Sequence, residues 1–387
     1  MKIFLVAGEA SGDQLGAQLM QALRRRAGAI SFAGVGGPAM RGEGLESLFP
    51  LADIAVMGFL PVLARLPRLL ARIDAAAAAA IAMRPDALVI IDSPDFTHRV
   101  ARRVRHALPD LPIVDYVSPT VWAWRPGRAR KMRAYIDHVL ALLPFEPEAY
   151  RRLGGPPCTY IGHPLIEKLP ALRPGAEDLQ ARAEAPPQLL VLPGSRRSEI
   201  RRLMPRFAAT LDLLRKQALQ FEAVLPAVAH LADDIRAEVA TWPVRPRIIE
   251  GDAAKWAAFR RARAALCASG TVTLELALAQ VPMVVAYEVS WLESHVRHFI
   301  TVPSIVLPNL ILGENRIPEL LQENCRPEAL AAAVAALLGE GAERAGQRAA
   351  FAAIEAHLRI DAETPSDVAA QQLCRIIATK NDNKARR

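Results

Sequence analysis

The stretch that decides the fold class reads ALVIIDSPDF and runs from Ala87 to Phe96. Its five leading apolar residues are typical of a strand that is buried on both faces of a parallel sheet. A short loop and a helical pattern follow, which completes a strand–loop–helix unit. An acid directly after a buried strand lies at the carboxyl edge of the sheet, where Asp92 suits a general base. Asp95 instead suits the N-cap of the next helix. The alternative is that an acid in this loop only caps that helix and has no catalytic role.

The same unit recurs in both halves of the chain. Helical patterns cover residues 14–26 and 63–83. Further strands are expected at residues 3–7, 113–117, 139–142, 189–192, 222–225, 247–249, 264–268 and 283–286. Alternating strands and helices predict an α/β fold with two tandem doubly wound, Rossmann-like domains that face a cleft. Ligands are expected at the carboxyl ends of the strands.

The domain limits follow from this pattern and from proline. We expect domains at residues 1–165 and 188–345, with a proline-rich linker over 166–187. Ala-rich helices and a polar tail over 346–387 complete the chain, and they could pack back on the first domain.

Charge and cysteine content narrow the class of protein. The 387 residues carry 48 Lys and Arg against 40 Asp and Glu, a net charge of +8 that predicts an anionic partner. Nucleic acid, a phosphorylated metabolite and an acidic membrane surface all fit this charge. The 4 cysteines are far apart and lack metal-ligand spacing, which favours reduced thiols in the cytosol and no metal. No apolar segment reaches the ~20 residues that span a bilayer.

Four small-residue turns follow expected strands and could hold phosphate groups. Residues 8–13 (GEASGD) and 32–37 (FAGVGG) lie in the first half, where the simpler interpretation of the second is a plain turn. In the second half, Gly194 and Ser195 offer backbone donors and Arg196 a forked cation for a diphosphate, unless they only begin a helix. Ser269, Gly270 and Thr271 precede another helix, in which Glu275 could bind sugar hydroxyls or be an ordinary first-turn acid.

Two indoles stand two residues apart in SPTVWAWR, residues 118–125. Trp122, Trp124 and Arg125, with four more cations up to residue 133, suit a ligand with a flat or apolar part and a phosphate. The alternative is a packed turn whose indoles fill a core. Asn309 lies between apolar neighbours and also has two interpretations. It is either a functional residue or a core amide whose hydrogen bonds are satisfied within the fold.

Residues 57–72 combine large apolar side chains with a purely basic polar face. The apolar members are Met57, Phe59, Leu63, Leu66, Leu69 and Leu70, and the basic ones are Arg65, Arg68 and Arg72. Such a helix could lie on an anionic bilayer or open an apolar channel for acyl chains. The alternative is an ordinary amphipathic helix packed on its own sheet.

Taken together, these segments resemble the lipid-A-disaccharide synthase family. Its members are inverting glycosyltransferases of the two-domain B type. The resemblance covers residues 4 to about 378. Its motifs are GEASGD at 8–13, DSPDF at 92–96, SPTVWAWR at 118–125, LPFE at 143–146, IGHP at 161–164, LPGSR at 192–196, SGTVTLE at 269–275 and LPNL at 307–310. Ala10 and Thr120 are conservative departures from the family pattern.

The resemblance implies a reaction and a set of site residues. UDP-2,3-diacylglucosamine and 2,3-diacylglucosamine 1-phosphate would give the β-1,6-linked disaccharide 1-phosphate and UDP, without a cofactor or metal. Glu9, Asp92, Arg196 and Asn309 match positions that the family treats as essential. Asp92 is our hypothesis for the base and Glu9 for a residue that positions the acceptor or shares the proton, although their roles could be exchanged.

The remaining residues divide between the two substrates and the membrane. The second domain would bind UDP through Gly194, Ser195, Arg196, Ser269, Gly270, Thr271 and Glu275. The first would bind the acceptor and its acyl chains through Ser11, Asp13, Trp122, Trp124, Arg125, Met57, Phe59, Leu63, Leu66, Leu69 and Leu70. Arg65, Arg68 and Arg72 would contact the anionic inner-membrane surface from the cytoplasmic side.

Two other classes of protein remain as alternatives. The chain could also form a homodimer. A UDP-sugar epimerase of the same architecture would need no acyl-binding surface and no acceptor. A basic nucleic-acid-binding protein would place its cations in a stripe with interleaved aromatic residues, whereas here they gather beside Gly/Ser turns and one apolar helix.

Overall fold

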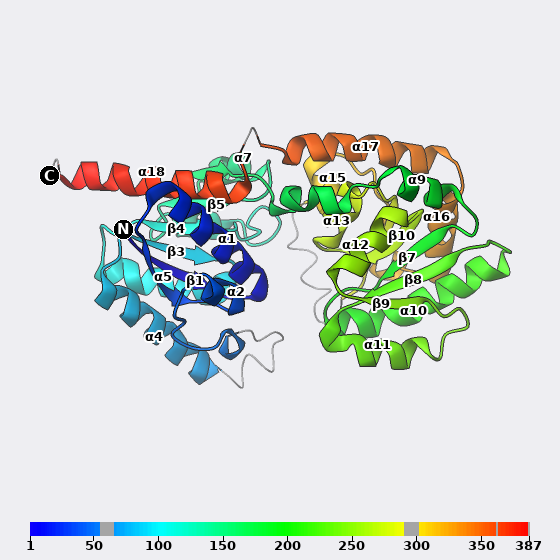
Figure 1. Cartoon of the computed structure of the whole chain (residues 1–387), viewed down its shortest axis with the longest axis horizontal. Helices are drawn as coiled ribbons and strands as arrows, with labels where there is room; N and C mark the ends of the chain where they lie inside the picture. Colours follow the sequence, from blue (N-terminus) through cyan, green and yellow to red (C-terminus); the bar gives the residue numbers. More distant parts are fainter. Residues whose placement is uncertain (55–65, 290–301, 361–362, 386–387) are drawn as a thin grey trace. The chain divides into compact units, whose positions relative to one another are not determined.

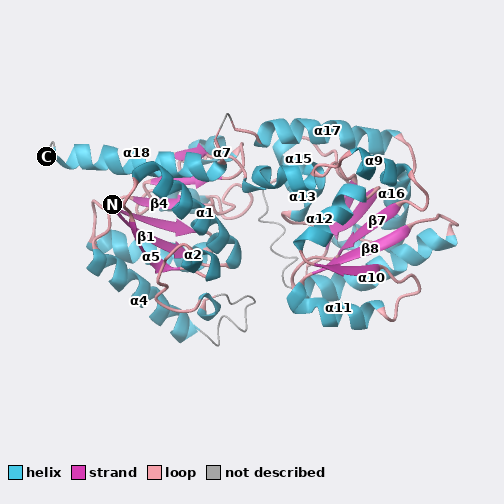
Figure 2. Ribbon diagram, viewed as in Figure 1, coloured by secondary structure: helices cyan, strands magenta, loops and turns pink. Residues whose placement is uncertain are grey.

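A computed structural model describes residues 1–54, 66–289, 302–360 and 363–385. The chain forms two compact units (Figures 1 and 2). The first contains Met1–Pro164 together with Ile360–Arg387, and the second contains Leu165–Arg359.

Each unit is built on a parallel sheet with six described strands. In the first unit the order is β2-β1-β3-β4-β5-β6. These strands are β1 (Lys2–Ala7), β2 (Ser31–Val35), β3 (Ala87–Ile91), β4 (Ile113–Tyr116), β5 (His138–Ala141) and β6 (Cys158–Tyr160). Ala7 is in register with Ile91, and Ile91 with Tyr116, so the loops after β1, β3 and β4 begin at the same sheet edge.

Helices cover both faces of this sheet. They are α1 (Ala10–Ala27), α2 (Pro38–Gly42), η1 (Leu51–Asp53), α4 (Leu66–Met83), α5 (Pro94–Ala107), α6 (Gly127–Met132), α7 (Glu146–Arg152) and α18 (Pro365–Ala385). Ile3 and Leu5 pack in one core with α1 and α18, whereas Phe4 and Val6 pack in another with α4 and α5. Burial on both faces is the reason that β1 is apolar at consecutive positions.

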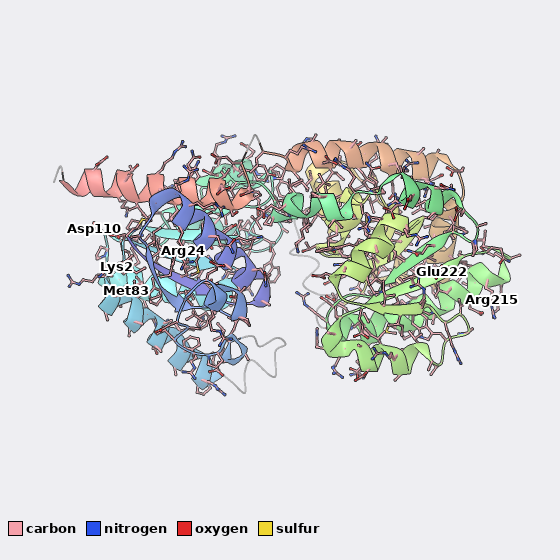
Figure 3. All side chains as sticks on the ribbon, in the orientation of Figure 1. Lys2, Arg24, Met83, Asp110, Arg215 and Glu222 are labelled. Atoms are coloured by element: carbon pink, nitrogen blue, oxygen red, sulfur yellow. The ribbon has the colours of Figure 1, made fainter. Side chains whose placement is uncertain are left out.

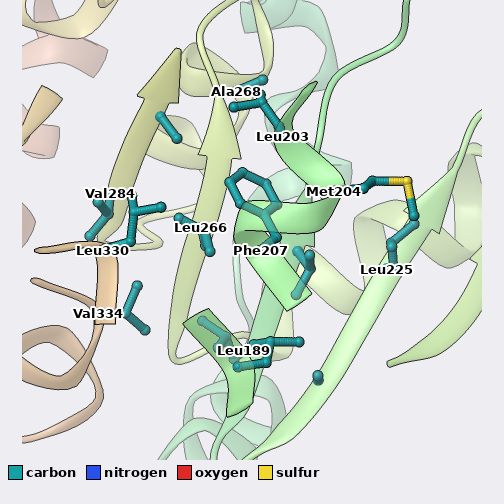
Figure 4. Packing of buried hydrophobic residues seen from close by; sticks show 14 of the residues in the cluster. Leu189, Leu203, Met204, Phe207, Leu225, Leu266, Ala268, Val284, Leu330 and Val334 are labelled. Carbon is teal, nitrogen blue, oxygen red and sulfur yellow. The ribbon is translucent and has the colours of Figure 1, made fainter. Parts of the chain in front are cut away.

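The second unit repeats the design with the strand order β12-β11-β10-β7-β8-β9. Its strands are β7 (Gln188–Leu192), β8 (Glu222–Ala227), β9 (Arg247–Glu250), β10 (Ala264–Ala268), β11 (Met283–Tyr287) and β12 (Glu319–Leu321). Phe207 fills the centre of one core, between Leu203, Leu266 and the other labelled apolar residues (Figure 4). The predicted α/β class with two doubly wound domains is confirmed.

Helices again flank the sheet. They are α8 (Leu169–Leu172), α9 (Ala176–Ala183), α10 (Arg197–Lys216), η3 (Ala229–Leu231), α11 (Ala232–Val239), α12 (Asp252–Arg261), α13 (Val272–Leu278), α15 (Leu307–Leu312), η5 (Gln322–Asn324), α16 (Pro327–Leu338) and α17 (Ala342–Leu358), with η2 (Pro164–Lys168) at the sequence boundary. Charged side chains cover their outer surfaces, and Arg215 near the end of α10 (Figure 3) pairs with Asp212 at 2.6 Å.

Residues 166–187, expected as a linker, form part of the second unit. The buried Arg182 on α9 donates hydrogen bonds to the backbone carbonyls of Phe259 and Arg260 at the end of α12, and of Ala279 and Gln280 just after α13. These charge-assisted contacts fix the segment on the unit despite its prolines.

The C-terminal helices divide between the two units. Helix α17 belongs to the second unit, and α18 packs on α1 in the first. Helix α18 also continues through the expected polar tail as far as Ala385, and its Lys380 pairs with Asp137 at 3.0 Å. Among the described residues, no helix has the length and apolar content needed to cross a membrane.

Candidate active site

Two acidic residues meet at the carboxyl edge of the first sheet. The Ser11 hydroxyl donates to Asp92 Oδ2 at 3.2 Å, and the Ser93 hydroxyl donates to Glu9 Oε1 at 3.1 Å. Asp92 Oδ1 also accepts a hydrogen bond from the Ser93 backbone N–H at 2.7 Å. The loops after β1 and β3 therefore bring together the predicted Glu9, Ser11 and Asp92, and they add Ser93, which the sequence analysis did not single out.

The close approach of these loops depends on Gly8 and on a strained turn. A Cβ atom on Gly8 would lie only 2.1 Å from Ser93 Cβ. Asp92 and Ser93 have φ values of 56° and 44°, a left-handed conformation that costs energy for residues with side chains. The Thr97 hydroxyl donates to the Asp92 carbonyl at 2.7 Å and helps to hold the turn. Stored strain at this point is typical of a functional site.

Asp13 has a structural task that the sequence did not reveal. Its buried carboxylate accepts hydrogen bonds from the backbone N–H groups of Gly37, Ala39 and Met40 at 2.7, 2.9 and 3.0 Å. Asp13 therefore satisfies the N-terminus of α2. Three backbone donors share its two carboxylate oxygens, so the observed contacts of Asp13 lie within the fold, and its place among the acceptor-binding residues stays a prediction.

Trp122 is likewise a core residue. Its indole Nε1 donates to Glu146 Oε1 at 3.0 Å, and its ring meets Phe145 edge-on with centroids 5.0 Å apart. Burial raises the pKa of Glu146 to about 7, although the Leu143 N–H and the Trp122 indole donate to its carboxylate and lower that pKa. These contacts fit the packed-turn alternative for Trp122, and its expected contact with the acceptor stays a prediction.

The other end of the same motif lies at the surface. The exposed Arg125 guanidinium stacks over the Trp124 ring, 4.6 Å from its centroid. Arg125 also lines a cavity of about 670 Å³ with residues of α5 and α6. Only the last part of SPTVWAWR is therefore available to a ligand in the described structure.

A second cavity, of about 740 Å³, lies within the second unit at the carboxyl ends of β7, β8 and β10. All seven residues predicted to bind UDP line it, namely Gly194, Ser195, Arg196, Ser269, Gly270, Thr271 and Glu275. They come from two strand–loop–helix units whose strands, β7 and β10, are neighbours in the sheet. Adjacent parallel strands bring both small-residue loops to one edge.

Glu199 holds the first of these loops in place. Its Oε2 lies within hydrogen-bonding distance of the Ser195 and Arg196 backbone N–H groups, at 3.2 and 3.3 Å, and its Oε1 pairs with the Arg196 guanidinium at 3.1 Å. Gly194 has φ = 108°, and a Cβ there would lie 2.4 Å from Glu199 Oε2. The sequence signal for Glu199 was its place three residues into a helix start, where acids cap the backbone.

A lysine also faces the second loop. Lys255 Nζ on α12 lies 2.6 Å from Glu275 Oε2, and both residues line the cavity. Lys255 was not predicted from the sequence, because α12 has the pattern of an ordinary surface helix. Its ammonium adds a second cation beside Arg196 in a cavity that suits an anionic ligand.

Asn309 is the satisfied core amide of the two alternatives. The buried side chain donates to the Ile317 carbonyl and to Glu319 Oε1, both at 2.9 Å. It accepts from the backbone N–H groups of Arg316 and Ile317 at 3.0 and 2.9 Å. Its donors and its acceptor are occupied within the fold, which fits a positioning residue, and the expected catalytic role of Asn309 stays a prediction.

A short chain of contacts links Asn309 to the cavity. Glu319, which accepts from Asn309, also accepts from the Ile305 backbone N–H at 3.0 Å through its other oxygen. The Ile305 carbonyl in turn accepts from the Ser269 hydroxyl at 2.8 Å. Asn309 thus supports the loop that carries Ser269.

We expect Asn309→Ala to lower the free energy of unfolding by roughly 3 kcal/mol, because it leaves several buried polar groups without partners. Urea unfolding followed by tryptophan fluorescence measures this change. The exposed Asn324 supplies a control, since Asn324→Ala should change stability little. Normal stability with lost turnover in Asn309→Ala would instead return this residue to the chemistry.

The predicted membrane helix is only partly described. Met57, Phe59, Leu63 and Arg65 lie outside the described residues. Arg68 and Arg72 both pair with Asp53, at 2.6 and 2.7 Å, so their positive charge is partly balanced. Leu69 and Leu70 are half-buried against the core of the first unit. The net positive charge of this helix face is therefore smaller than the sequence predicted, because Asp53 of η1 pairs with both arginines.

The chain matches the family model described as Lipid-A-disaccharide synthetase over residues 3–373. It belongs to the lipid-A-disaccharide synthase family. The lipid-A-disaccharide synthase of Nitrobacter winogradskyi is 56% identical over 387 residues, which cover 100% of this chain and 97% of that protein. The predicted enzyme class is confirmed: the protein is a glycosyltransferase of lipid A biosynthesis that makes the lipid A disaccharide.

Two solved structures show how widely this fold is shared. A UDP-GlcNAc 2-epimerase from Neisseria meningitidis bound to UDP-GlcNAc has a TM-score of 0.63 at 11% identity, covering 98% of this chain and 100% of that one. MurG from Acinetobacter baumannii has a TM-score of 0.56 at 16% identity, covering 98% and 99%. At these identities the likeness concerns the fold alone, and the family match decides between synthase and epimerase.

Proposed function

We propose that Asp92 is the general base that takes the proton of the acceptor's 6-hydroxyl. The hydroxyl oxygen then bonds to the anomeric carbon of UDP-2,3-diacylglucosamine, and the bond to the UDP oxygen breaks with inversion. The acceptor is 2,3-diacylglucosamine 1-phosphate, and the products are the β-1,6-linked disaccharide 1-phosphate and UDP. The observation that carries this assignment is the strained turn that presents the Asp92 carboxylate beside Glu9.

Glu9 is proposed to position the acceptor. Ser93 donates to Glu9 through its hydroxyl and to Asp92 through its backbone N–H, so one residue links both carboxylates. Ser11 donates to the other oxygen of Asp92. These hydrogen bonds orient the Asp92 carboxylate and leave each of its oxygens with further lone pairs for a substrate hydroxyl.

The cavity of the second unit is proposed to bind UDP. Arg196 and the backbone N–H groups of its loop would bind the diphosphate, whose charge grows as the bond to the sugar breaks. The Ser269–Thr271 loop would add further donors, and Glu275 would bind the ribose hydroxyls. Lys255 supports this proposal because it brings a cation into the same cavity.

Product analysis tests the proposal. Purified protein supplied with both acylated substrates should form the disaccharide 1-phosphate on thin-layer chromatography and release one UDP per disaccharide. Neither substrate alone should react. Consumption of the UDP-sugar without any acceptor would contradict the proposal and favour an epimerase.

Attachment to the cytoplasmic face of an anionic membrane is a further part of the proposal. Leu66 at the start of α4 is 38% exposed, and the Arg68 side chain beside it is 58% exposed. An apolar side chain contributes about 0.8 kcal/mol for each methylene that it buries in lipid, and each cation adds attraction to anionic headgroups.

We expect Leu66→Ser with Arg68→Ser to reduce co-sedimentation with anionic vesicles, because the pair removes both contributions. The matched control is Leu179→Ser with Arg215→Ser in the second unit. Leu179 is 44% exposed, and the Arg215 side chain is 57% exposed and paired with an acid, as Arg68 is. Equal vesicle binding by the two double variants would count against a membrane contact at the start of α4.

A further inference from the structure

A strongly basic cavity lies between α5 and α6 in the first unit. Its volume is about 670 Å³, and its cationic lining residues are Arg99, Arg102, Arg103, Arg125, Arg128 and Lys131. The lining contains a single carboxylate, that of Asp95. So many cations around one hollow repel one another, and an anionic ligand would relieve this repulsion.

Most of these cations lack a close acidic partner. Arg103 pairs with Asp74 at 2.6 Å, whereas Arg128 meets Asp95 only at 3.4 Å. Within the described part of the chain, Arg99, Arg125 and Lys131 take part in no ion pair. The positive charge of the cavity is therefore mostly uncompensated by the protein.

A buried polar chain holds one of the arginines. The Arg102 guanidinium donates to the Tyr135 hydroxyl at 3.1 Å and lies over the Tyr135 ring, 4.6 Å from its centroid. The Tyr135 hydroxyl lies 3.1 Å from His98 Nδ1, and His98 Nε2 lies 3.2 Å from Asp115 Oδ2. His98 and Asp115 are almost completely buried. An ordinary solvated helix face does not need such a buried network, so the cavity has the features of a pre-organised site.

The cavity also begins next to the proposed base. Pro94 and Asp95 line it and follow Asp92 and Ser93 directly in the chain. Helix α5 advances about 1.5 Å per residue, so the Arg99 backbone is roughly 7.5 Å along the axis from Pro94. In the acceptor, C1 carries the phosphate and C5 carries the 6-hydroxymethyl group, and both carbons are bonded to the ring oxygen, so the two groups belong to neighbouring positions of one sugar. A hydroxyl bound at Asp92 therefore leaves the phosphate within reach of this cavity.

We propose that the cavity between α5 and α6 binds the 1-phosphate of the acceptor glycolipid. The inference rests on the proposed function of Asp92 and gives that site its specificity for a phosphorylated sugar. Arginine forks and a lysine ammonium supply the charge-assisted hydrogen bonds that a phosphate monoester accepts. Membrane phospholipids offer related phosphate groups, so the experiment has to separate the two sources.

The test compares two acceptors in detergent micelles, 2,3-diacylglucosamine 1-phosphate and unphosphorylated 2,3-diacylglucosamine. The measured quantity is the ratio of their kcat/KM values. Arg99→Ser with Lys131→Ser should lower this ratio by roughly tenfold or more, because two charge-assisted contacts are lost. An unchanged ratio overturns the inference.

The control removes two neighbouring charges outside the cavity. Arg130 on α6 and Arg133 just after it are exposed and do not line the cavity, so Arg130→Ser with Arg133→Ser makes the same change in net charge. This control should keep the ratio of the unmodified protein. If the double variant instead keeps the ratio and loses binding to anionic vesicles, the cavity holds phospholipid headgroups and the inference is wrong.

A second measurement needs no variant and therefore does not depend on correct folding. Glucosamine 1-phosphate should compete with the acceptor more strongly than glucosamine does, and equal competition overturns the inference. The two proposals fail in different ways. If no disaccharide forms with either acceptor, the proposed function fails, whereas equal use of both acceptors by the unmodified protein refutes only the phosphate site.

Discussion

Replacing Asp92 by Asn is expected to lower kcat by roughly 10²–10⁴-fold, the usual loss when a general base is removed. The amide keeps the size of the side chain and a hydrogen-bond acceptor for Ser11, but it cannot take the proton of the attacking hydroxyl. The residues proposed to bind UDP belong to the second unit, so the affinity for UDP should stay unchanged. Steady-state kinetics and calorimetry with UDP measure the two quantities.

An exposed acid in the same unit provides the comparison. Asp110 lies at the surface (Figure 3), and Asp110→Asn should leave turnover near that of the unmodified protein. Retained turnover in Asp92→Asn would remove Asp92 as the base and transfer the assignment to Glu9. Glu9→Gln would then carry the large loss of kcat.

Arg196→Ala is expected to weaken UDP binding by roughly ten- to hundredfold, because a hydrogen bond between two charged groups is lost. Glu199 would still accept from the backbone N–H groups of Ser195 and Arg196, so the loop should keep its shape. The change is therefore expected in the Kd for UDP, measured by calorimetry, rather than in the stability of the fold.

The neighbouring arginine is the matched control. Arg197 is exposed, pairs with Asp234 at 2.7 Å and does not line the cavity proposed to bind UDP. Arg197→Ala should therefore leave the Kd for UDP unchanged. Equal affinities of Arg196→Ala and the unmodified protein would exclude Arg196 from the diphosphate site.

Local sequence predicted the strands well where both faces of the sheet are covered. The expected strand at residues 87–91 and the strand at residues 264–268 match β3 and β10 at both ends. The edge strands β2, β6 and β12 were missed, because partial burial leaves them without a continuous apolar run. Residues 32–35, expected as part of a glycine-rich turn, belong to β2. Burial on both faces gives a strand a continuous apolar run, and this signal is weaker at a sheet edge, although the edge strand β9 was expected at residues 247–249.

The carboxyl-edge rule also predicted which loops of the candidate site lie close together. It brought Glu9 beside Asp92 and the Gly194 loop beside Ser269, because neighbouring parallel strands end at one edge. The rule says where a loop lies but not which atoms a side chain contacts. For that reason the hydrogen bonds that Asp13, Trp122 and Asn309 make within the fold could not be predicted from the sequence.

The two parallel sheets and the motifs at their edges could be predicted from the chain alone, since strand burial and loop position follow from local apolar runs and turn residues. The tertiary structure was needed to show that Asp13, Trp122 and Asn309 form hydrogen bonds with partners inside the fold. It alone also gathered Arg99 and Lys131 around one cavity. The physical reason is that hydrogen-bond satisfaction and charge balance depend on partners from other segments of the chain, which no local pattern contains.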